Sequence, residues 1–247
     1  CSKRCAYCDF TTRAISADSP ELDAYRDRLI REIRKATREG LLGSIQTIYI
    51  GGGTPSYFGH SRLVELAYTI SLSINLDDNS EFTIEANPDS LSGAMVRDLF
   101  ALGVNRFSLG VQSFVDSELE WLGRSHDSQQ ALDAISLIQE RCDNVAIDLI
   151  CGIPGQSIVS WEQNIKRAIE AGVSHISVYP LTIEEHTPLA GRIASGEDQS
   201  PNEDLQAEMM LSAATLLQSQ GFTRYEVASY ARPSYECRHN ISYWTGI

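Results

Sequence analysis

Three cysteines lie within the first eight residues, at Cys1, Cys5 and Cys8, and form a Cys-x3-Cys-x2-Cys motif. Thiolates this close together can bind one metal centre, and soft sulfur ligands select zinc, copper(I) or an iron–sulfur cluster. A structural zinc site needs four ligands, but no further cysteine or histidine follows before His60. An iron–sulfur cube held by three cysteines leaves one iron open to an exogenous ligand. The motif therefore favours a [4Fe-4S] cluster with an open iron over a zinc module.

A glycine run, Gly51-Gly52-Gly53-Thr54, directly follows the β-prone segment 45–50. Glycine lets the backbone approach a ligand closely and adopt positive φ. The carboxyl end of a parallel strand, where this run is expected, is also where ligands bind. A plain strand-to-helix turn has a similar composition. The position of the run after the cysteine loop favours the ligand-binding interpretation.

Three polar residues, Glu85, Gln112 and Asp148, lie at or near the ends of later β-prone segments. A carboxylate is costly to bury among β-branched residues unless it is paired. Arg106 or Arg124 could be the structural partner of any one of them. Three polar residues at equivalent strand-end positions favour the lining of a pocket instead. Arg124 itself suits a carboxylate as a forked donor, or it is an exposed helix cation.

The last residues contain Cys237-Arg-His239-Asn-Ile-Ser-Tyr243-Trp244. Imidazole is a common axial ligand of heme iron, flat aromatic rings can pack against a macrocycle, and the thiolate of Cys237 is a competing ligand. By residue types alone, the segment is more typical of a polar–aromatic packing corner that leads to a further domain.

Short β-prone segments alternate with amphipathic segments along the chain. Strands are predicted at 45–50, 82–86, 106–111, 145–150 and 175–179, with a weaker one at 223–227. The first predicted helix is opened by Ser19-Pro20-Glu21 and ended by Gly40. Further helices are predicted at 89–102, 129–139, 161–171 and 203–220, and Gly103, Gly172 and Gly221 follow three of them.

Alternating strands and helices imply an α/β fold with a parallel sheet covered by helices. We expect the cysteine loop to follow a strand that lies upstream of this sequence. With five strong strands and one weak strand, the pattern predicts a partial (β/α)6-type TIM barrel rather than a closed barrel of ~250 residues. A doubly wound sheet is the alternative. Residues 1–247 read as one core domain, truncated before its first strand, and 222–247 leads toward an absent C-terminal domain.

Composition excludes several classes of protein. The chain has 247 residues, 33 of them acidic and 20 basic, which gives a net charge of -13. Nucleic-acid binding normally requires a basic surface, so we expect no nucleic-acid partner. No apolar run reaches the ~18 residues that a membrane span needs. The clustered thiols predict a reducing, cytoplasmic location, and Cys142 and Cys151 are expected to be buried as small hydrophobic residues.

The cysteine motif, with Tyr7 before its third cysteine, resembles the radical S-adenosylmethionine (SAM) superfamily. The resemblance implies that the open iron binds the amino acid part of SAM, and that reduction of the cluster by an electron donor cleaves SAM to a 5′-deoxyadenosyl radical. The glycine run then resembles the motif that holds the amino group of the cofactor.

The segments Asn105–Phe114, Leu122–His126 and Asp148–Gln156 resemble the coproporphyrinogen III oxidase branch of this superfamily. The oxygen-independent oxidase has a further cysteine two residues after its motif, where this sequence has Phe10. Cys8-Asp-Phe10 and the His-Asn-x-x-Tyr-Trp segment instead resemble the HemW family of heme chaperones. The resemblance implies a protein that binds heme and delivers it to an acceptor protein. The alternative is an oxidoreductase that decarboxylates coproporphyrinogen III.

The resemblance also assigns roles to individual residues. It implies a cluster on Cys1, Cys5 and Cys8. It implies SAM contacts from a larger set, namely Tyr7 (near a second SAM molecule), Gly51, Gly52, Gly53, Thr54, Glu85, Gln112, Arg124 and Asp148. For heme it implies His239 as the iron ligand, Tyr243 and Trp244 as walls, and Cys237 as the competing ligand.

Overall fold

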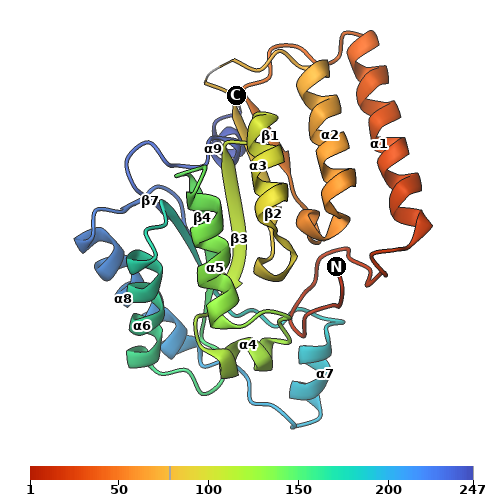
Figure 1. The fold of residues 1–247 in the computed structure, drawn as a ribbon. Coiled ribbons are helices and arrows are strands. Elements are labelled where there is room, and N and C mark those ends of the chain that lie inside the picture. The colour runs from red at the N-terminus through yellow and green to blue at the C-terminus, as the bar shows by residue number, and fades with distance from the viewer. Residues whose placement is uncertain (78, 247) are drawn as a thin grey trace.

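A computed structural model describes residues 1–77 and 79–246 and contains a seven-stranded sheet of order β1-β2-β3-β4-β5-β7-β6 (Figure 1). Five strands pair in parallel, each with the next one along the chain: β1 (Thr47–Ile50), β2 (Glu81–Ala86), β3 (Arg106–Gln112), β4 (Val145–Cys151) and β5 (His175–Pro180). The last two, β6 (Thr223–Arg224) and β7 (Ser229–Ala231), form an antiparallel pair, and β7 runs antiparallel to β5.

The helices connect the parallel strands and lie mainly along one face of the sheet (Figure 1). They are α1 (Pro20–Arg38), α2 (His60–Ser73), α3 (Gly93–Ala101), α4 (Asp116–Leu122), α5 (Ser128–Gln139), α6 (Ile158–Glu170), α7 (Pro188–Ala194), α8 (Glu203–Ser219) and α9 (Arg238–Thr245), with short 3₁₀ turns η1 (Pro55–Phe58) and η2 (Pro88–Ser90). Among the described residues, no helix is both long and apolar enough to cross a membrane.

All five strongly predicted strands are present, and their ends lie within two residues of the predicted ends. The weaker strand predicted at 223–227 ends at Arg224, because the chain turns there. The Arg224 side chain donates hydrogen bonds to the carbonyls of Glu226 (3.1 Å) and Val227 (2.5 Å), and β7 then returns beside β5. The sheet therefore ends in an antiparallel hairpin and not in a sixth parallel strand.

The helix predictions were confirmed for α1, α5, α6 and α8, but α3 begins later than predicted. Pro88–Ser90 forms the turn η2, and Ser92 caps α3 by accepting a hydrogen bond from Met95 N (3.2 Å). Helices α2, α4, α7 and α9 were not predicted. Three of these four are only seven or eight residues long, too short for a clear periodic pattern.

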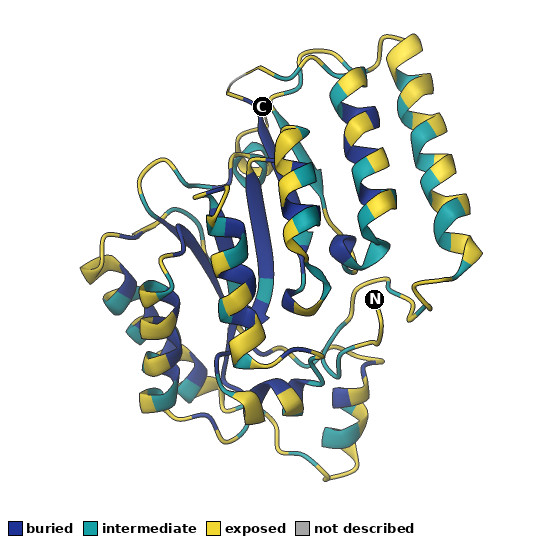
Figure 2. Ribbon diagram, viewed as in Figure 1, coloured by how far each residue is buried: buried dark blue, intermediate teal, exposed yellow. Residues whose placement is uncertain are grey.

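The two faces of the parallel sheet differ in polarity. Residues that point toward the helices are apolar and form the main core, in which Phe82, Phe107, Ile147 and Ile176 are fully buried. Figure 2 shows the central strands β2, β3 and β4 as mostly buried, β1 as intermediate, and the outer sides of the helices as exposed. The alternating positions on the other face are largely polar, and many of them line a cavity: Tyr49, Glu85, Arg106, Ser108, Gln112, Asp148, His175, Ser177 and Tyr179.

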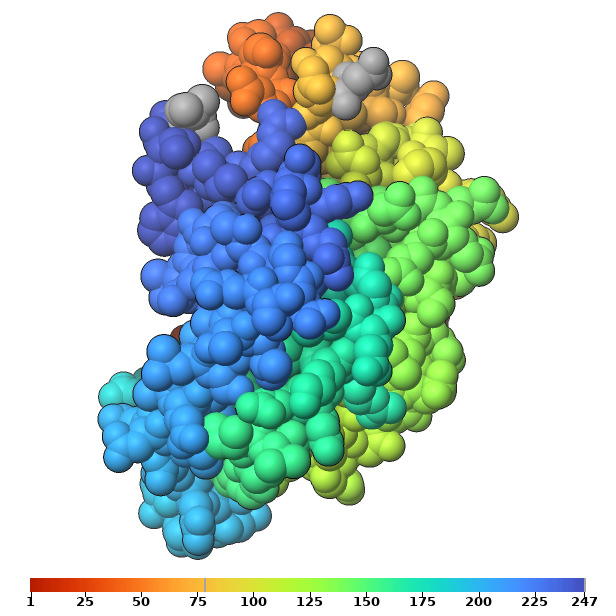
Figure 3. Space-filling model, turned by 90° about the vertical axis from the view of Figure 1, so that its left-hand side faces the viewer, coloured from red at the N-terminus to blue at the C-terminus, as the bar shows by residue number. Residues whose placement is uncertain are grey.

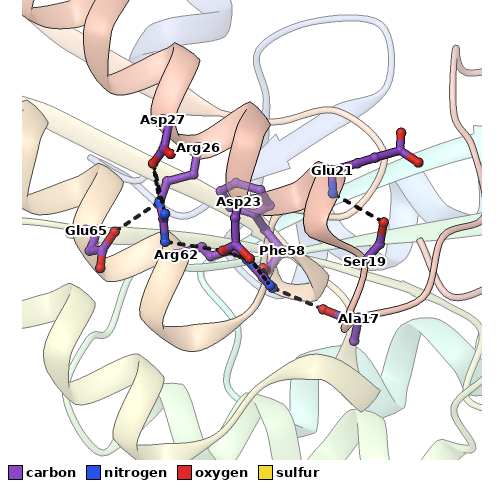
Figure 4. Close-up of polar contacts among 9 residues, drawn as sticks. All are labelled: Ala17, Ser19, Glu21, Asp23, Arg26, Asp27, Phe58, Arg62 and Glu65. Carbon is purple, nitrogen blue, oxygen red and sulfur yellow. Dashed lines mark hydrogen bonds and ion pairs between the residues drawn. The ribbon is translucent and has the colours of Figure 1, made fainter.

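Helix α1 has no fully buried residue; Leu29 and Ile33 pack against the core, and polar contacts also join it to α2 (Figure 4). Arg62 of α2 donates to Asp23 (Nε–Oδ1 2.7 Å) and to the carbonyls of Ala17 and Phe58 (both 3.1 Å). Arg26 pairs with Glu65 (3.2 Å). These contacts place α1 beside α2. The bond from Arg62 to the Ala17 carbonyl also holds the segment that joins the N-terminal cysteine loop to α1.

The two ends of the sheet carry different segments. The N-terminal cysteine loop lies where the parallel strands end, whereas α9 lies near the end where they begin (Figure 1). Figure 3 shows a face that is covered to a large extent by the C-terminal part of the chain, in blue. Helix α9 contacts the first residues of β1 and β2, Thr47 and Glu81.

Candidate functional site

A cavity of about 250 Å³ runs from the cysteine loop into the polar face of the sheet. With one exception, the predicted cluster and SAM residues line it together: Cys1, Cys5, Tyr7, Cys8, Gly52, Gly53, Thr54, Glu85, Gln112, Arg124 and Asp148. Gly51 is the exception, and a Cβ at this position would lie 3.0 Å from Glu85 Oε2. The residues thus converge at the carboxyl ends of the strands, where parallel sheets bind ligands.

The cysteine loop is held by the segments around it. Ala6 N donates to the carbonyl of Leu122 at the end of α4 (3.1 Å), and the Ala6 carbonyl accepts from Leu189 N in α7 (2.9 Å). The thiol of Cys1 lies 3.0 Å from Thr54 Oγ1, and Thr12 Oγ1 donates to the same sulfur (3.3 Å). The loop is therefore fixed to both the glycine run and the helices at this end of the sheet.

The chemistry of this loop fits an iron–sulfur cluster. All three cysteines are free and partly exposed to the cavity, and hydroxyl and guanidinium groups donate to the sulfurs of Cys1 and Cys5. Such donors stabilise thiolates and tune a bound cluster. Within the described part of the chain, no three Cys, His, Asp or Glu side chains converge closely enough for a single metal ion. A cubane cluster instead spreads its thiolates over separate irons.

Glu85 holds the glycine run in place. Its Oε1 accepts a hydrogen bond from the Tyr49 hydroxyl (2.7 Å), and its Oε2 accepts one from Gly52 N (3.0 Å). Burial, followed by the Glu85 charge, raises the pKa of Tyr49 well above its usual value, so its hydroxyl remains a donor. A Cβ on Gly51 would lie 2.8 Å from the Tyr49 ring and 3.0 Å from Glu85 Oε2. The loop therefore requires glycine beside this carboxylate.

Arg124 connects the end of β3 to the cysteine loop. Its Nη2 donates to Asn87 Oδ1 and to the Gly110 carbonyl (both 2.7 Å), and its Nη1 points to Cys5 Sγ (3.6 Å). Arg124 is a half-buried residue of the cavity wall and not an exposed helix cation, and within the chain its Nη2 pairs with neutral oxygens. Neighbouring Gln112 has a φ of 69°, an uncommon conformation for a residue other than glycine, at a register shift in β3.

Asp148 and Tyr7 are titratable groups of the same cavity. Burial, and after it the nearby Glu85 charge, raises the pKa of Asp148 to about 6. Burial also raises the pKa of Tyr7 to about 12, against the effect of Arg124. Asp148 pairs in register with Ser177 of β5, which places its carboxyl at mid-depth in the cavity. Near pH 6 its carboxyl can therefore act either as a donor or as an acceptor.

The predicted heme residues lie on or next to α9. The His239 ring stacks on Tyr49 (centroids 4.9 Å apart), and its Nδ1 and Nε2 lie 2.9 Å from Thr47 Oγ1 and 3.2 Å from Tyr243 Oη. Tyr243 and Trp244 are 74% and 72% exposed. Cys237 is fully buried, with its thiol directed at Glu81 (3.5 Å). The structure thus places this group at the opposite end of the strands from the cysteines.

Comparisons with known proteins give the family. Residues 1–168 match the Radical SAM superfamily, and the chain belongs to this superfamily, as the cysteine motif predicted. The chain is 36% identical over 245 residues to "Heme chaperone HemW" of Lactococcus lactis subsp. lactis (strain IL1403), covering 99% of this chain and 63% of that protein. It is 35% identical over 247 residues to the Danio rerio protein "Radical S-adenosyl methionine domain-containing protein 1, mitochondrial", covering 100% of this chain and 55% of that one.

A solved structure described as "Coproporphyrinogen III oxidase (HemN) from Escherichia coli is a Radical SAM enzyme" matches with a TM-score of 0.83 and 23% identity. The match covers 100% of this chain and 56% of the HemN chain, and at this identity it shows the fold alone. It confirms the predicted α/β partial barrel. The chain spans less than two thirds of the length of each of these three proteins.

Sequence reasoning missed several residues of the cavity. Tyr49, Asn87 and His175 line it, and Arg106 faces the cavity instead of forming an ion pair with Glu85 or Asp148. A signal for them was present in the strands, since polar residues alternate with apolar ones in Arg106–Gln112 and in His175–Pro180. The burial predicted for Cys142 and Cys151 is confirmed.

Proposed function

We propose that this chain is the core of a heme chaperone that binds a [4Fe-4S] cluster, SAM and heme and delivers heme to acceptor proteins. The observation that carries the proposal is an imidazole on α9, His239, that contacts the exposed ring of Tyr243, with the exposed ring of Trp244 next along the helix. It is supported by 36% identity to a protein named heme chaperone HemW. Phe10 stands where the oxidase has its further cysteine, and it is 68% exposed beside the cluster loop.

The cluster and cofactor assignments follow the cavity lining. Cys1, Cys5 and Cys8 hold the cluster, which supplies an open iron and an electron when reduced by a donor protein. The glycine run, Glu85, Gln112, Arg124 and Asp148 lie around the same cavity as these cysteines and would together hold SAM. In this arrangement the chain orients SAM and excludes water from it, while the sheet supplies the polar contacts.

His239 has the surroundings of an iron ligand. When its Nδ1 donates to Thr47 Oγ1 (2.9 Å), its Nε2 carries the lone pair that can bind a metal. In metal-bound histidines, an acceptor on the other ring nitrogen fixes the tautomer in the same way. The hydroxyl at Nε2 belongs to Tyr243, which is exposed and free to swing away. Iron would then replace this hydroxyl, with Tyr243 and Trp244 beside the macrocycle.

Cys237 is less suited to the same role. Burial raises the pKa of its thiol, and the adjacent Glu81 carboxylate raises it further. Glu81 also accepts hydrogen bonds from the backbone N–H groups of Arg238 (2.9 Å) and His239 (3.0 Å) at the start of α9. Thiolate ligation would require α9 to leave Glu81, so we assign the iron to His239.

Heme titration of the anaerobically reconstituted full-length protein tests this proposal. We expect stoichiometric heme binding with a Soret band that shifts in His239→Ala, while the cluster and SAM affinity persist. His60→Ala is the matched control, because His60 is a partly exposed histidine that pairs with Asp98 (2.9 Å) far from α9. An unchanged spectrum in His239→Ala would show that the ligand assignment is wrong.

A second arm separates the chaperone from the oxidase. The same preparation is incubated with coproporphyrinogen III, SAM and a reductant, and decarboxylated products are measured. Product formation without heme binding would replace the chaperone with the oxidoreductase. Transfer of bound heme to a heme-free acceptor protein, in the cytoplasm where we place this protein, is the activity that the proposal requires.

A further inference from the structure

Two buried donors lie at the inner end of the cavity, away from the cysteines. Arg106 and His175 are the first residues of β3 and β5, so both lie at the amino end of the parallel sheet. They are 2% and 1% exposed, and both line the cavity. Arg106 Nε and His175 Nδ1 are buried and have no hydrogen-bond partner in the described part of the chain.

The hydrogen bonds around His175 are compatible with an N–H on Nδ1. Tyr225 Oη accepts a hydrogen bond from Cys237 N (3.3 Å) and lies 2.7 Å from His175 Nε2, to which it can donate its own proton. Burial and the Arg106 charge hold the pKa of His175 well below its usual value, so the ring is neutral. When Tyr225 donates to Nε2, the single N–H of this neutral ring is on Nδ1, which is buried and has no hydrogen-bond partner among the described residues.

Two of the carboxylates around these donors are engaged by other groups, and a third, Asp148, lies close enough to interact with the Arg106 charge but forms no ion pair with it. Glu81 accepts from the backbone of Arg238 and His239, as described above, and Glu85 accepts from Tyr49 and from the glycine run. A buried guanidinium without a partner is costly, and so is a buried imidazole N–H. Two such donors at the inner end of one cavity are the complement of an oxygen ligand that carries negative charge.

We propose that Arg106 and His175 form a subsite for the carboxylate group of a small organic molecule. This molecule would be anchored at the amino end of the sheet, and the remainder of it would extend toward the glycine run and the cysteine loop. The subsite lies deeper than the residues assigned to SAM, so it is occupied together with SAM. The proposal goes beyond heme delivery and does not depend on it, because no residue of α9 supplies either donor.

Binding of [1-¹³C]propionate to the reconstituted full-length protein, at saturating SAM, tests the subsite. We expect saturable broadening of the carboxyl resonance, and no such broadening for propionamide, which has the same shape without the charge. Arg106→Gln should weaken propionate binding about tenfold or more, the loss expected for a charge-assisted hydrogen bond. Arg97→Gln is the matched control, since Arg97 is exposed on α3 and pairs with Asp98.

A second experiment covers the case in which Arg106→Gln fails to fold. Crystals of the parent protein are soaked with 3-bromopropionate, and the bromine is located by its anomalous signal, which we expect inside the barrel with the carboxylate on Arg106 and His175. Bromine at other positions only would overturn the proposal. Equal affinity for propionamide, or unchanged affinity in a folded Arg106→Gln, would overturn it as well. The titration is repeated without SAM, and propionate binding that is present there but lost at saturating SAM would show that these donors serve the cofactor and would overturn the proposal.

Discussion

Replacing Glu85 tests how the glycine run is held. Both carboxylate oxygens are used within the chain, one by the Tyr49 hydroxyl at 2.7 Å and one by Gly52 N at 3.0 Å. Glu85→Ala removes both acceptors and leaves the partly buried Tyr49 hydroxyl without its partner. Hydrogen bonds to charged groups contribute about 1.5–3 kcal/mol each, and the bond from the exposed Gly52 lies at the low end of this range.

The loop released by Glu85→Ala must be ordered again when SAM binds. We therefore expect SAM affinity to fall by about 1–3 kcal/mol, or ~5- to 150-fold. Glu85→Gln should lose far less, because the amide oxygen can accept from Gly52 while the amide nitrogen donates to the Tyr49 hydroxyl. Tyr49→Phe removes one of the two bonds and should fall between these variants.

Anaerobic calorimetric titration of SAM into the reconstituted proteins gives the three affinities, with iron and sulfide analysis to confirm equal cluster content. Equal losses in Glu85→Gln and Glu85→Ala would mean that the carboxylate charge contacts SAM directly, and that holding the loop is secondary. No loss in either variant would refute the role of Glu85 altogether.

Three further predictions concern the same cavity. Alanine at any one of the three motif cysteines should abolish the cluster in iron, sulfide and electron-resonance analysis, and stoichiometric zinc without cluster uptake would contradict this assignment. Arg124→Gln should lower the reduction potential of the cluster, because it removes a positive charge from the side of a ligating sulfur, whereas Arg97→Gln should leave it unchanged. The pKa of Asp148 is raised to about 6 from 3.8, so the folded protein retains this proton after the unfolded chain has lost it. The stability that this proton contributes is present below about pH 4 and is lost as pH rises through about 6. The thermal unfolding midpoint of the parent protein should therefore fall between these pH values, and the midpoint of Asp148→Asn should change less. An equal fall in both proteins would contradict this prediction.

The parallel strands and the residues at their carboxyl ends were predictable because local patterns define them. Apolar alternation defined each strand, and the carboxyl ends of parallel strands meet at one edge, so Glu85, Gln112 and Asp148 had to lie close together. What each side chain contacts was not predictable. The partners of Glu85 include a backbone N–H of the glycine run, and no pattern of residue types announces such a contact.

The antiparallel end of the sheet and the position of α9 depend on contacts distant in sequence. The bond between Arg224 and Val227 turns the chain locally, but β7 is placed by pairing with β5, which lies more than fifty residues earlier. Helix α9 begins where Glu81 accepts its first N–H groups, at a separation of 157 residues from Arg238. The sequence around Arg238 contains no pattern that indicates a carboxylate from a distant strand, so the start of α9 could not be predicted from it.

Tyr49 connects the two ends of the cavity, and this connection determines how the two sites can influence each other. Its hydroxyl holds Glu85 and through it the glycine run, whereas its ring stacks on His239 of α9. Tyr49→Phe breaks the first contact and keeps the second. If binding at one end alters the other through this residue, heme affinity differs with and without bound SAM, and linkage requires SAM affinity to differ by the same factor with and without heme. Tyr49→Phe should then reduce this factor, whereas equal heme affinities with and without SAM in the parent protein would show that the sites are occupied independently.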